Sequence, residues 1–473
     1  MNWTIALPEI VLAVIGLAIL IIGVLRKQDA VLLCTMLAIG GFLVAGLMVL
    51  TGTRGVGFNG QFVADSFSTF NKILILIGAS LAAILALDFN RKQGIERFEY
   101  PVLMLLATVG MMMMVSASNM MTLYLGLELQ SLSLYVLAAF ARDDLRSSEA
   151  GLKYFVLGGL ASGLLLYGMS LVYGFSGTMD FGQLASLLND PTKASPGLIV
   201  GVVFVLVGLA FKVSAVPFHM WTPDVYEGAP TSVTAFFATA PKVAAMALLL
   251  RVMSTPFGHL VAAWQSLIVI VAIASMVLGA FAAIGQTNIK RLMAYSSIAN
   301  MGYALAGLAV GTPDGVRGVL VYMTIYVFMT AGTFACIVAM RRQGRSVEQI
   351  SDLAGLATND SGLAALLAIF MFSMAGIPLL AGFFGKLYVF LAAVQGGLWT
   401  LAVVGVLSSV VGAFYYIRII KVMYFDPPAV AFDRRAPSLS FVAVATGLFT
   451  LLFFLYPSPV VDAANIAAHV LFR

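Results

Sequence analysis

The chain has 473 residues, of which 61% are hydrophobic and only 10% are charged. Because soluble domains carry about 25% charged residues, this composition excludes an ordinary soluble protein and predicts an all-α polytopic membrane protein. The formal net charge is +5. We attribute it to loop lysines and arginines that orient the protein in the membrane, not to nucleic-acid binding.

Apolar stretches of about 20 residues, separated by helix breakers, predict about fourteen membrane spans. The first apolar run, Ile10–Leu25, is long, and the positive charge of Arg26 and Lys27 follows it. It therefore reads as a first span and not as a cleavable signal. The spans are expected to centre near Val14, Ile39, Leu76, Val109, Ser131, Leu164, Leu206, Ala244, Ala272, Ala299, Ile325, Phe372, Leu407 and Leu448.

The loops between these spans alternate in charge. One set runs from Arg26/Lys27 to Arg434/Arg435 and carries most of the loop lysines and arginines. This set is expected to face the cytoplasm, so both chain termini face the outside if the span number is even. The Trp221–Thr231 loop has no basic residue and is placed by parity alone. The alternate set holds only Arg54, Lys193, Arg251, Arg317 and the terminal Arg473.

Two proline-marked breaks interrupt the apolar sequence, and each lies beside a lysine. In Gly208–Thr231, Pro217 removes a backbone donor about one turn after Lys212, and leaves the carbonyl of Val213 for water or a charge to satisfy. The apolar segment Leu363–Val394 is too long for one straight span and contains the second break, at GIPLLAGFFGK. Two such broken helices suggest a transporter built from two related halves.

Four charged residues lie deep inside spans, where an unpaired charge costs several kcal/mol. They are Glu128, Lys212, Lys242 and Lys386. Glu128 is interpreted as a proton-carrying group or as the partner of a lysine, with a purely structural carboxylate as the alternative. Snorkelling of Lys212 to the interface is the alternative to a functional role for that lysine, and it is hardest for Lys242. The helix of Lys242 also has a hydroxyl-rich half (Thr231, Ser232, Thr234 and Thr239).

Three further residues carry weaker signals. Lys153 lies only a few residues inside its span, so plain snorkelling explains it as well as function does. Lys72 is comparably deep, and we expect a structural ion pair with Asp65. His219 lies at the first break, where it could relay protons or cap a helix.

The type of these deep charges bears on which ion they could move. Sodium needs oxygen ligands, and a lysine repels it, whereas the deep set is one carboxylate and three lysines. A desolvated lysine can release its proton, and a nearby carboxylate keeps it charged. A coupled row of such groups could therefore carry protons. Cys34, Cys336 and the scattered histidines form no cluster, so no metal or other cofactor is expected in this chain.

Three long segments closely resemble the subunit N family of antiporter-like membrane subunits in bacterial NADH–quinone oxidoreductase, respiratory complex I. They are LKYFVLGGLASGLLLYGMSLVYGFSGT (Leu152–Thr178), PFHMWTPDVYEGAPT (Pro217–Thr231) and IKRLMAYSSIANMGYAL (Ile289–Leu305). The resemblance covers nearly the whole chain. It implies an N-terminal three-helix segment (residues 1–98), two inverted five-helix repeats (99–255 and 256–425) and a C-terminal helix (426–473).

The resemblance also implies a proton relay and partners. Glu128 and Lys212 match the family's glutamate–lysine pair, and Lys242 matches its connecting lysine. Lys386 matches the lysine of the exit half-channel, and Lys153 a lysine near proton uptake. FMN, iron–sulfur clusters and quinone are expected in partner subunits of a complex in the bacterial inner membrane, which also holds sister antiporter-like subunits and lipids.

Two other functions remain open at this point. A stand-alone cation/proton antiporter would show sodium-dependent transport without NADH, although the scarcity of deep carboxylates speaks against it. A purely structural spacer between sister subunits would tolerate neutral replacement of all three deep lysines.

Overall fold

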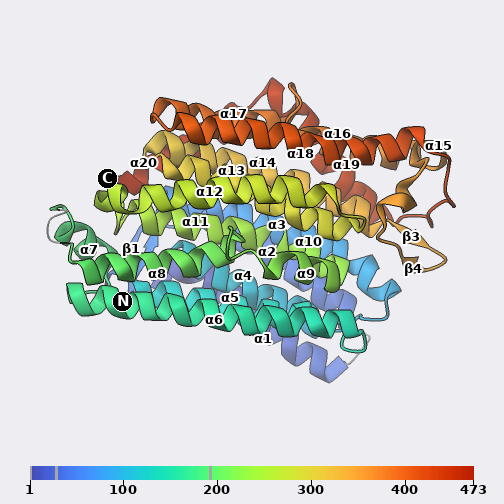
Figure 1. Ribbon diagram of the computed structural model, residues 1–473. Helices are drawn as coiled ribbons and strands as arrows, with labels where there is room; N and C mark the ends of the chain where they lie inside the picture. The colour runs from blue at the N-terminus through green and yellow to red at the C-terminus, as the bar shows by residue number, and fades with distance from the viewer. Residues whose placement is uncertain (1–2, 27–29, 191–193, 473) are drawn as a thin grey trace.

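The computed structural model describes residues 3–26, 30–190 and 194–472, and most of them are helical (Figure 1). The first part of the chain forms α1 (Leu7–Arg26), α2 (Val31–Thr51), α3 (Ser66–Lys92), α4 (Glu99–Val115), α5 (Met120–Ala138), α6 (Leu145–Ser176), α7 (Phe181–Leu187), α8 (Pro196–Val213), α9 (Trp221–Gly228), α10 (Thr231–Phe237) and α11 (Ala240–Ser254). The second part forms α12 (Val261–Ile284), α13 (Ile289–Ala309), α14 (Pro313–Val338), α15 (Leu356–Asn359), α16 (Ser361–Ala375), α17 (Ala381–Gln395), α18 (Trp399–Phe425), α19 (Pro437–Leu452) and α20 (Ser458–His469). Two short antiparallel hairpins pair β1 (Gly55–Gly57) with β2 (Phe62–Ala64) and β3 (Arg341–Arg342) with β4 (Arg345–Ser346).

The helices confirm a multi-pass membrane protein. In the described ranges, 11 helices are long and apolar enough to cross a membrane, and four further apolar helices are shorter. Two of the shorter ones, α16 and α17, are consecutive halves of the broken segment expected around Gly376. The total of fourteen spans stays a prediction.

The helices run side by side, so the bundle has two ends (Figure 1). We call the end that carries β3, β4 and α15 the basic end, because arginines and lysines in and beside the α3–α4, α5–α6 and α12–α13 connections lie there, namely Arg91, Lys92, Arg97, Arg142, Lys290 and Arg291. The N and C marks lie toward the other end, as do α7 and β1 (Figure 1). Lys27, Lys193 and Arg473 fall outside the described residues. The connections with many basic residues and those with few therefore lie toward opposite ends of the bundle.

Helix direction relates the two halves of the bundle. The α4 helix begins at the basic end, whereas α12, five spans later, begins at the opposite end, as two inverted five-helix sets would require. The central helices carry little lipid-facing surface. The most apolar window of Thr231–Ser254 is 100% buried and that of α14 is 94% buried. Polar side chains on these helices consequently face protein and not lipid.

Four expectations need correction. Lys72 pairs not with Asp65 but with Glu9 of α1, at 2.6 Å. Asp65 instead pairs with Arg251, which lies in α11 and is 4% exposed, not in a loop. The stretch after Trp221 is a helix, α9, and residues 426–473 contain two helices, α19 and α20, where one was expected.

Candidate functional site

Two interrupted helices form the framework of the site. The α8 helix ends at Val213, four residues before Pro217, because Ser214 adopts a left-handed conformation with φ 62°. The α16 helix ends at Ala375, and Gly376 follows with φ 89°. A helix end exposes carbonyl groups that have no intrahelical partner, and together they carry partial negative charge. Each break therefore creates a place inside the bundle that attracts a cation.

Lys242 occupies the first of these places. It is 1% exposed, and its Nζ donates to the carbonyl oxygen of Val213 at 3.4 Å and to the hydroxyl of Ser214. The Thr222 hydroxyl also donates to Ser214 Oγ, at 2.6 Å, which helps to hold the serine in a conformation that normally favours glycine. Of the two partners expected for the free carbonyl of Val213, water or a charged group, the structure places a lysine there, and it comes from the neighbouring helix α11.

Lys386 occupies the second place. Its Nζ donates to the carbonyl oxygens of Met374 and Ala375 at 2.8 and 3.1 Å, and to the hydroxyl of Ser409 at 2.7 Å. A Cβ at Gly376 would lie 3.2 Å from Nζ and Cδ of this lysine. Glycine is thus favoured at this position for two reasons: its φ is positive, and the ammonium group of Lys386 approaches closely.

Lys212 lies at the end of α8, just before the first break. Its Nζ donates to Ser131 Oγ at 2.7 Å and to the hydroxyl of Tyr135 at 3.5 Å. Glu128 lies one turn before Ser131 on α5, but its carboxylate makes no ion pair with Lys212 within 4.0 Å, and its Oε1 is buried without a hydrogen-bond partner. The expected glutamate–lysine pair is therefore separated, with the Ser131 hydroxyl holding the lysine.

Aromatic side chains link the surroundings of Lys212 and Lys242. The ring of Tyr135, which Lys212 contacts, lies edge-on to Tyr154 at 4.8 Å between centroids. Tyr154 in turn stacks on Trp221 at 4.4 Å, and Lys242 Nζ lies 5.2 Å from the Trp221 ring. The structure thus brings Lys212 and Lys242 into contact with one aromatic cluster.

A polar row on α13 lies in the second half and was missed by sequence reasoning. Tyr326 donates to Ser297 at 2.9 Å, and Tyr322 donates to Asn300 at 2.5 Å. One turn further along α13, the ring of Tyr303 lies 5.0 Å from Lys386 Nζ. The signal was present in the spacing, because Ser296, Ser297, Asn300 and Tyr303 share one helical face. This row leads from the α9 side of α13 to Lys386.

The remaining candidate residues, Lys153 and His219, lie away from the buried lysines and from the polar row of α13. Lys153 is 41% exposed and makes ion pairs with Glu149 and Asp224, at 2.7 Å each. Burial alone would raise the pKa of Asp224, but the hydrogen bonds and charges of Lys153 and Arg291 lower it. These residues line a surface cavity of about 150 Å³ at the basic end. His219 is half-buried at the first break, and its Nδ1 has no hydrogen-bond partner.

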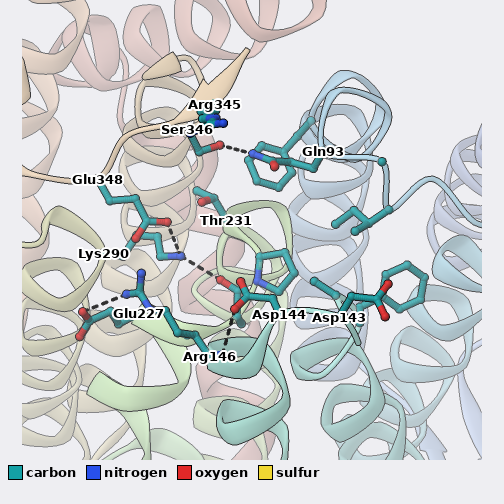
Figure 2. Close-up of a pocket in the computed structure, with 18 of the residues that line it drawn as sticks. Gln93, Asp143, Asp144, Arg146, Glu227, Thr231, Lys290, Arg345, Ser346 and Glu348 are labelled. Carbon is teal, nitrogen blue, oxygen red and sulfur yellow. Dashed lines mark hydrogen bonds and ion pairs between the residues drawn. The ribbon is translucent and has the colours of Figure 1, made fainter. Parts of the chain in front are cut away.

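A larger cavity of about 580 Å³ opens at the same end of the bundle (Figure 2). Lys290 in its wall is 3% exposed, pairs with Glu348 at 2.7 Å and donates to the carbonyl oxygen of Ala229 at 2.9 Å. Burial alone would raise the pKa of the Glu348 carboxyl, but Lys290 lowers it. Thr231 also lines this cavity and begins α10, whose hydroxyl-rich sequence leads toward Lys242. Water can therefore approach the protein interior at this point.

Metal binding has no support in the described ranges of the chain. There, no group of three or more His, Cys, Asp or Glu side chains is placed to hold a metal ion. Cys34 and Cys336 are both buried and free.

Comparison with known proteins defines the class to which this fold and site belong. The family model described as "NADH:quinone oxidoreductase/Mrp antiporter, TM" matches residues 117–412, which include both breaks and all four deep charges. The fold also matches a chain of the Mrp complex from Dietzia sp. DQ12-45-1b, with a TM-score of 0.87 at 23% identity over 100% of this chain and 97% of that one. The protein is thus an antiporter-like membrane subunit.

Relatives with higher sequence identity show which family within this class the chain belongs to. NADH-quinone oxidoreductase subunit N of Granulibacter bethesdensis is 64% identical over 100% of both chains. Subunit N of Rhodospirillum rubrum is 58% identical over 98% of this chain and 97% of its own. A chain of respiratory complex I from Thermus thermophilus has a TM-score of 0.83 at 33% identity, covering 98% of this chain and 99% of that one. The chain belongs to the NADH-quinone oxidoreductase subunit N family.

Proposed function

We propose that this chain translocates protons as a membrane subunit of an NADH–quinone oxidoreductase, driven by electron transfer in partner subunits. The observation that carries the proposal is the pair of helix breaks, each with a buried lysine bound to free backbone carbonyls. Such an arrangement holds a cation at a fixed place without a carboxylate partner, so the proton on the lysine is the mobile charge.

The relay uses the contacts of the three deep lysines in order. Protons taken up at the basic end would reach Lys212, pass to Lys242 across the aromatic cluster, and continue along the polar row of α13 to Lys386. Motion of Glu128 toward or away from Lys212 would change how strongly that lysine holds its proton. Water is needed between these groups, because the direct contacts run to hydroxyl and carbonyl oxygens and not from lysine to lysine.

The orientation and the partners complete the proposal. The basic end faces the cytoplasm of a bacterium, and both termini lie on the periplasmic side of the inner membrane. FMN, iron–sulfur clusters and quinone belong to partner subunits, and sister antiporter-like subunits lie alongside in the membrane. The catalytic activity is that of the whole complex, and this chain supplies the proton path.

Sodium transport is the alternative that the site geometry disfavours. The backbone carbonyls at both breaks, which are the natural sodium ligands, already accept hydrogen bonds from lysines. Proton pumping by the complex in proteoliposomes is therefore expected to be equal in sodium and in potassium buffers. Pumping that requires sodium would contradict the proposal.

Lys242→Ala is expected to lower NADH-driven proton pumping by about tenfold or more, because it removes a buried relay group. Lys153→Ala is expected to lower it by less than about fivefold, because Lys153 is exposed and water can replace it. The measurement is the proton-to-electron ratio and the pumping rate of the two variant complexes in proteoliposomes. The reverse order would assign the essential role to Lys153.

A further inference from the structure

An apolar groove lies on the outside of the bundle at the end opposite the basic one. It has a volume of about 440 Å³ and runs between α3, α14, α19 and α20. Phe328 and Phe449 line it, and their rings stack with centroids 3.9 Å apart. Ile466 of α20 also lines it and is 59% exposed. Because these helices belong to a multi-pass membrane protein, the groove opens toward the hydrocarbon of the bilayer.

A single charged residue, Arg54, lines this groove. It lies in the short connection between α2 and β1, three residues after the α2 span ends at Thr51. A span that ends there leaves the hydrocarbon for the headgroup region at about this point. Its Nη1 donates to the neutral hydroxyl of Ser66 at 3.0 Å. Among the described residues, no carboxylate lies within 4.0 Å of its guanidinium, in contrast to Arg251, whose charge is compensated by Asp65. Arg54 is exposed and its positive charge remains free for a ligand.

A second pocket of about 180 Å³, with a mixed lining that is more polar than that of the groove, adjoins the groove and shares Arg54 and Thr69 with it. Hydroxyl groups of Thr51, Thr53 and Ser68 belong to residues that line it, and the buried Lys72 lies at its inner side. Lys72 is already paired with Glu9, so Arg54 supplies the uncompensated charge. The two pockets together form one amphipathic site, with an apolar arm and a polar arm that meet at a guanidinium.

We propose that this site binds one phospholipid with a net negative headgroup, from the membrane leaflet at this end of the bundle. The phosphate would lie on Arg54, the headgroup would extend into the hydroxyl-lined pocket, and an acyl chain would fill the groove beneath it. A guanidinium matches a phosphate with two parallel hydrogen bonds. A zwitterionic lipid brings its own cation and leaves part of the Arg54 charge uncompensated, so an anionic lipid is favoured.

The test measures lipid binding to the membrane complex that is purified by an affinity tag on this chain. Native mass spectrometry after titration with phosphatidylglycerol or phosphatidylethanolamine would report the two affinities. We expect Arg54→Gln to weaken phosphatidylglycerol binding by about fivefold, the effect of one basic residue at a membrane surface, and to weaken phosphatidylethanolamine binding by less, so that the preference for the anionic lipid shrinks. Ala463→Phe, which places a ring in the groove, should reduce binding of both lipids.

Arg434→Gln is the matched control, because Arg434 is an exposed arginine at the other end of the bundle, and it should leave this binding unchanged. Equal phosphatidylglycerol affinity in the wild type, Arg54→Gln and Ala463→Phe would overturn the proposal. So would loss of a neighbouring subunit in Ala463→Phe without any change in bound lipid, which would identify the occupant as a partner helix. Arg54, Ala463 and Arg434 lie outside the proposed proton relay, so NADH-driven pumping should be retained in all three variants. A change in lipid binding with normal pumping therefore tests the lipid site independently of the relay.

Discussion

Lys386→Ala is expected to reduce coupled proton pumping by about tenfold or more, because Lys386 is the cation that satisfies the carbonyl groups at the second helix break. Loss of this group would interrupt the path after the polar row of α13. The measurement is the proton-to-electron ratio of the reconstituted complex. A normal ratio in Lys386→Ala would remove Lys386 from the relay.

Arginine at position 386 separates a relay role from a structural one. It keeps a positive charge near the same carbonyl groups, but it does not release its proton under physiological conditions. If Lys386 carries protons, Lys386→Arg should also pump poorly, even though the complex assembles. If the position needs only a cation, Lys386→Arg should restore pumping. Lys421→Ala, at an exposed lysine of α18, is the control for a general effect of removing a lysine.

Arg251→Ala is expected to destabilise the fold by about 3–5 kcal/mol, because it leaves the carboxylate of Asp65 without its cation. The two side chains form two hydrogen bonds of 2.9 and 3.0 Å, and they join the end of α11 to the start of α3. Denaturation of the purified protein in detergent would measure the loss. The double variant Arg251→Met with Asp65→Asn should recover part of it, since no unpaired charge remains. Wild-type stability of Arg251→Ala alone would contradict the prediction.

The same ion pair predicts how this stability depends on pH. Burial alone would raise the pKa of Asp65, but the charge and hydrogen bonds of Arg251, together with Ser68, hold it below its usual value. A lowered folded-state pKa contributes stability above the unfolded pKa, and the contribution is lost as the pH falls through the folded value. The contribution of this pair to the stability of the wild type should be constant from about pH 5 to 7 and shrink below about pH 4. In Arg251→Ala, where burial acts on the pKa of Asp65 without its cation, stability should instead rise as the pH falls and the carboxyl is protonated.

The sequence was most informative about charges inside spans. Lys242 and Lys386 could be predicted as functional candidates because a buried cation in lipid is costly, and both breaks could be predicted from proline and glycine. The first break begins earlier than Pro217 suggests, because Ser214 turns into the left-handed region while hydrogen bonds hold it there. A proline marks the neighbourhood of such a break, but side-chain contacts decide where the helix stops.

The partners of these charges could not be predicted. Lys72 forms an ion pair with Glu9 on another helix, and Lys212 donates a hydrogen bond to Ser131 and does not pair with Glu128. Several polar groups were possible partners in each case, and only the packing of the helices decides which one lies close enough. The polar row of α13 could not be predicted from the sequence for a different reason. Serine, asparagine and tyrosine are uncharged, and in a membrane helix they often serve packing alone. Only the positions of Tyr322 and Tyr326 on α14 reveal that the row is continuous.

The two breaks differ in which helix supplies the lysine, and this difference makes the two halves unequal. Lys386 belongs to the same broken span as the carbonyl groups it binds, so that half carries its own counter-charge when it moves. Lys242 belongs to α11 but binds the end of α8, and its 3.4 Å contact with Val213 is already near the limit of a hydrogen bond. Sliding of α11 along α8 would therefore break the contact with the Val213 carbonyl first and leave Lys242 on the Ser214 hydroxyl alone, whereas Lys386 would keep both of its carbonyl partners.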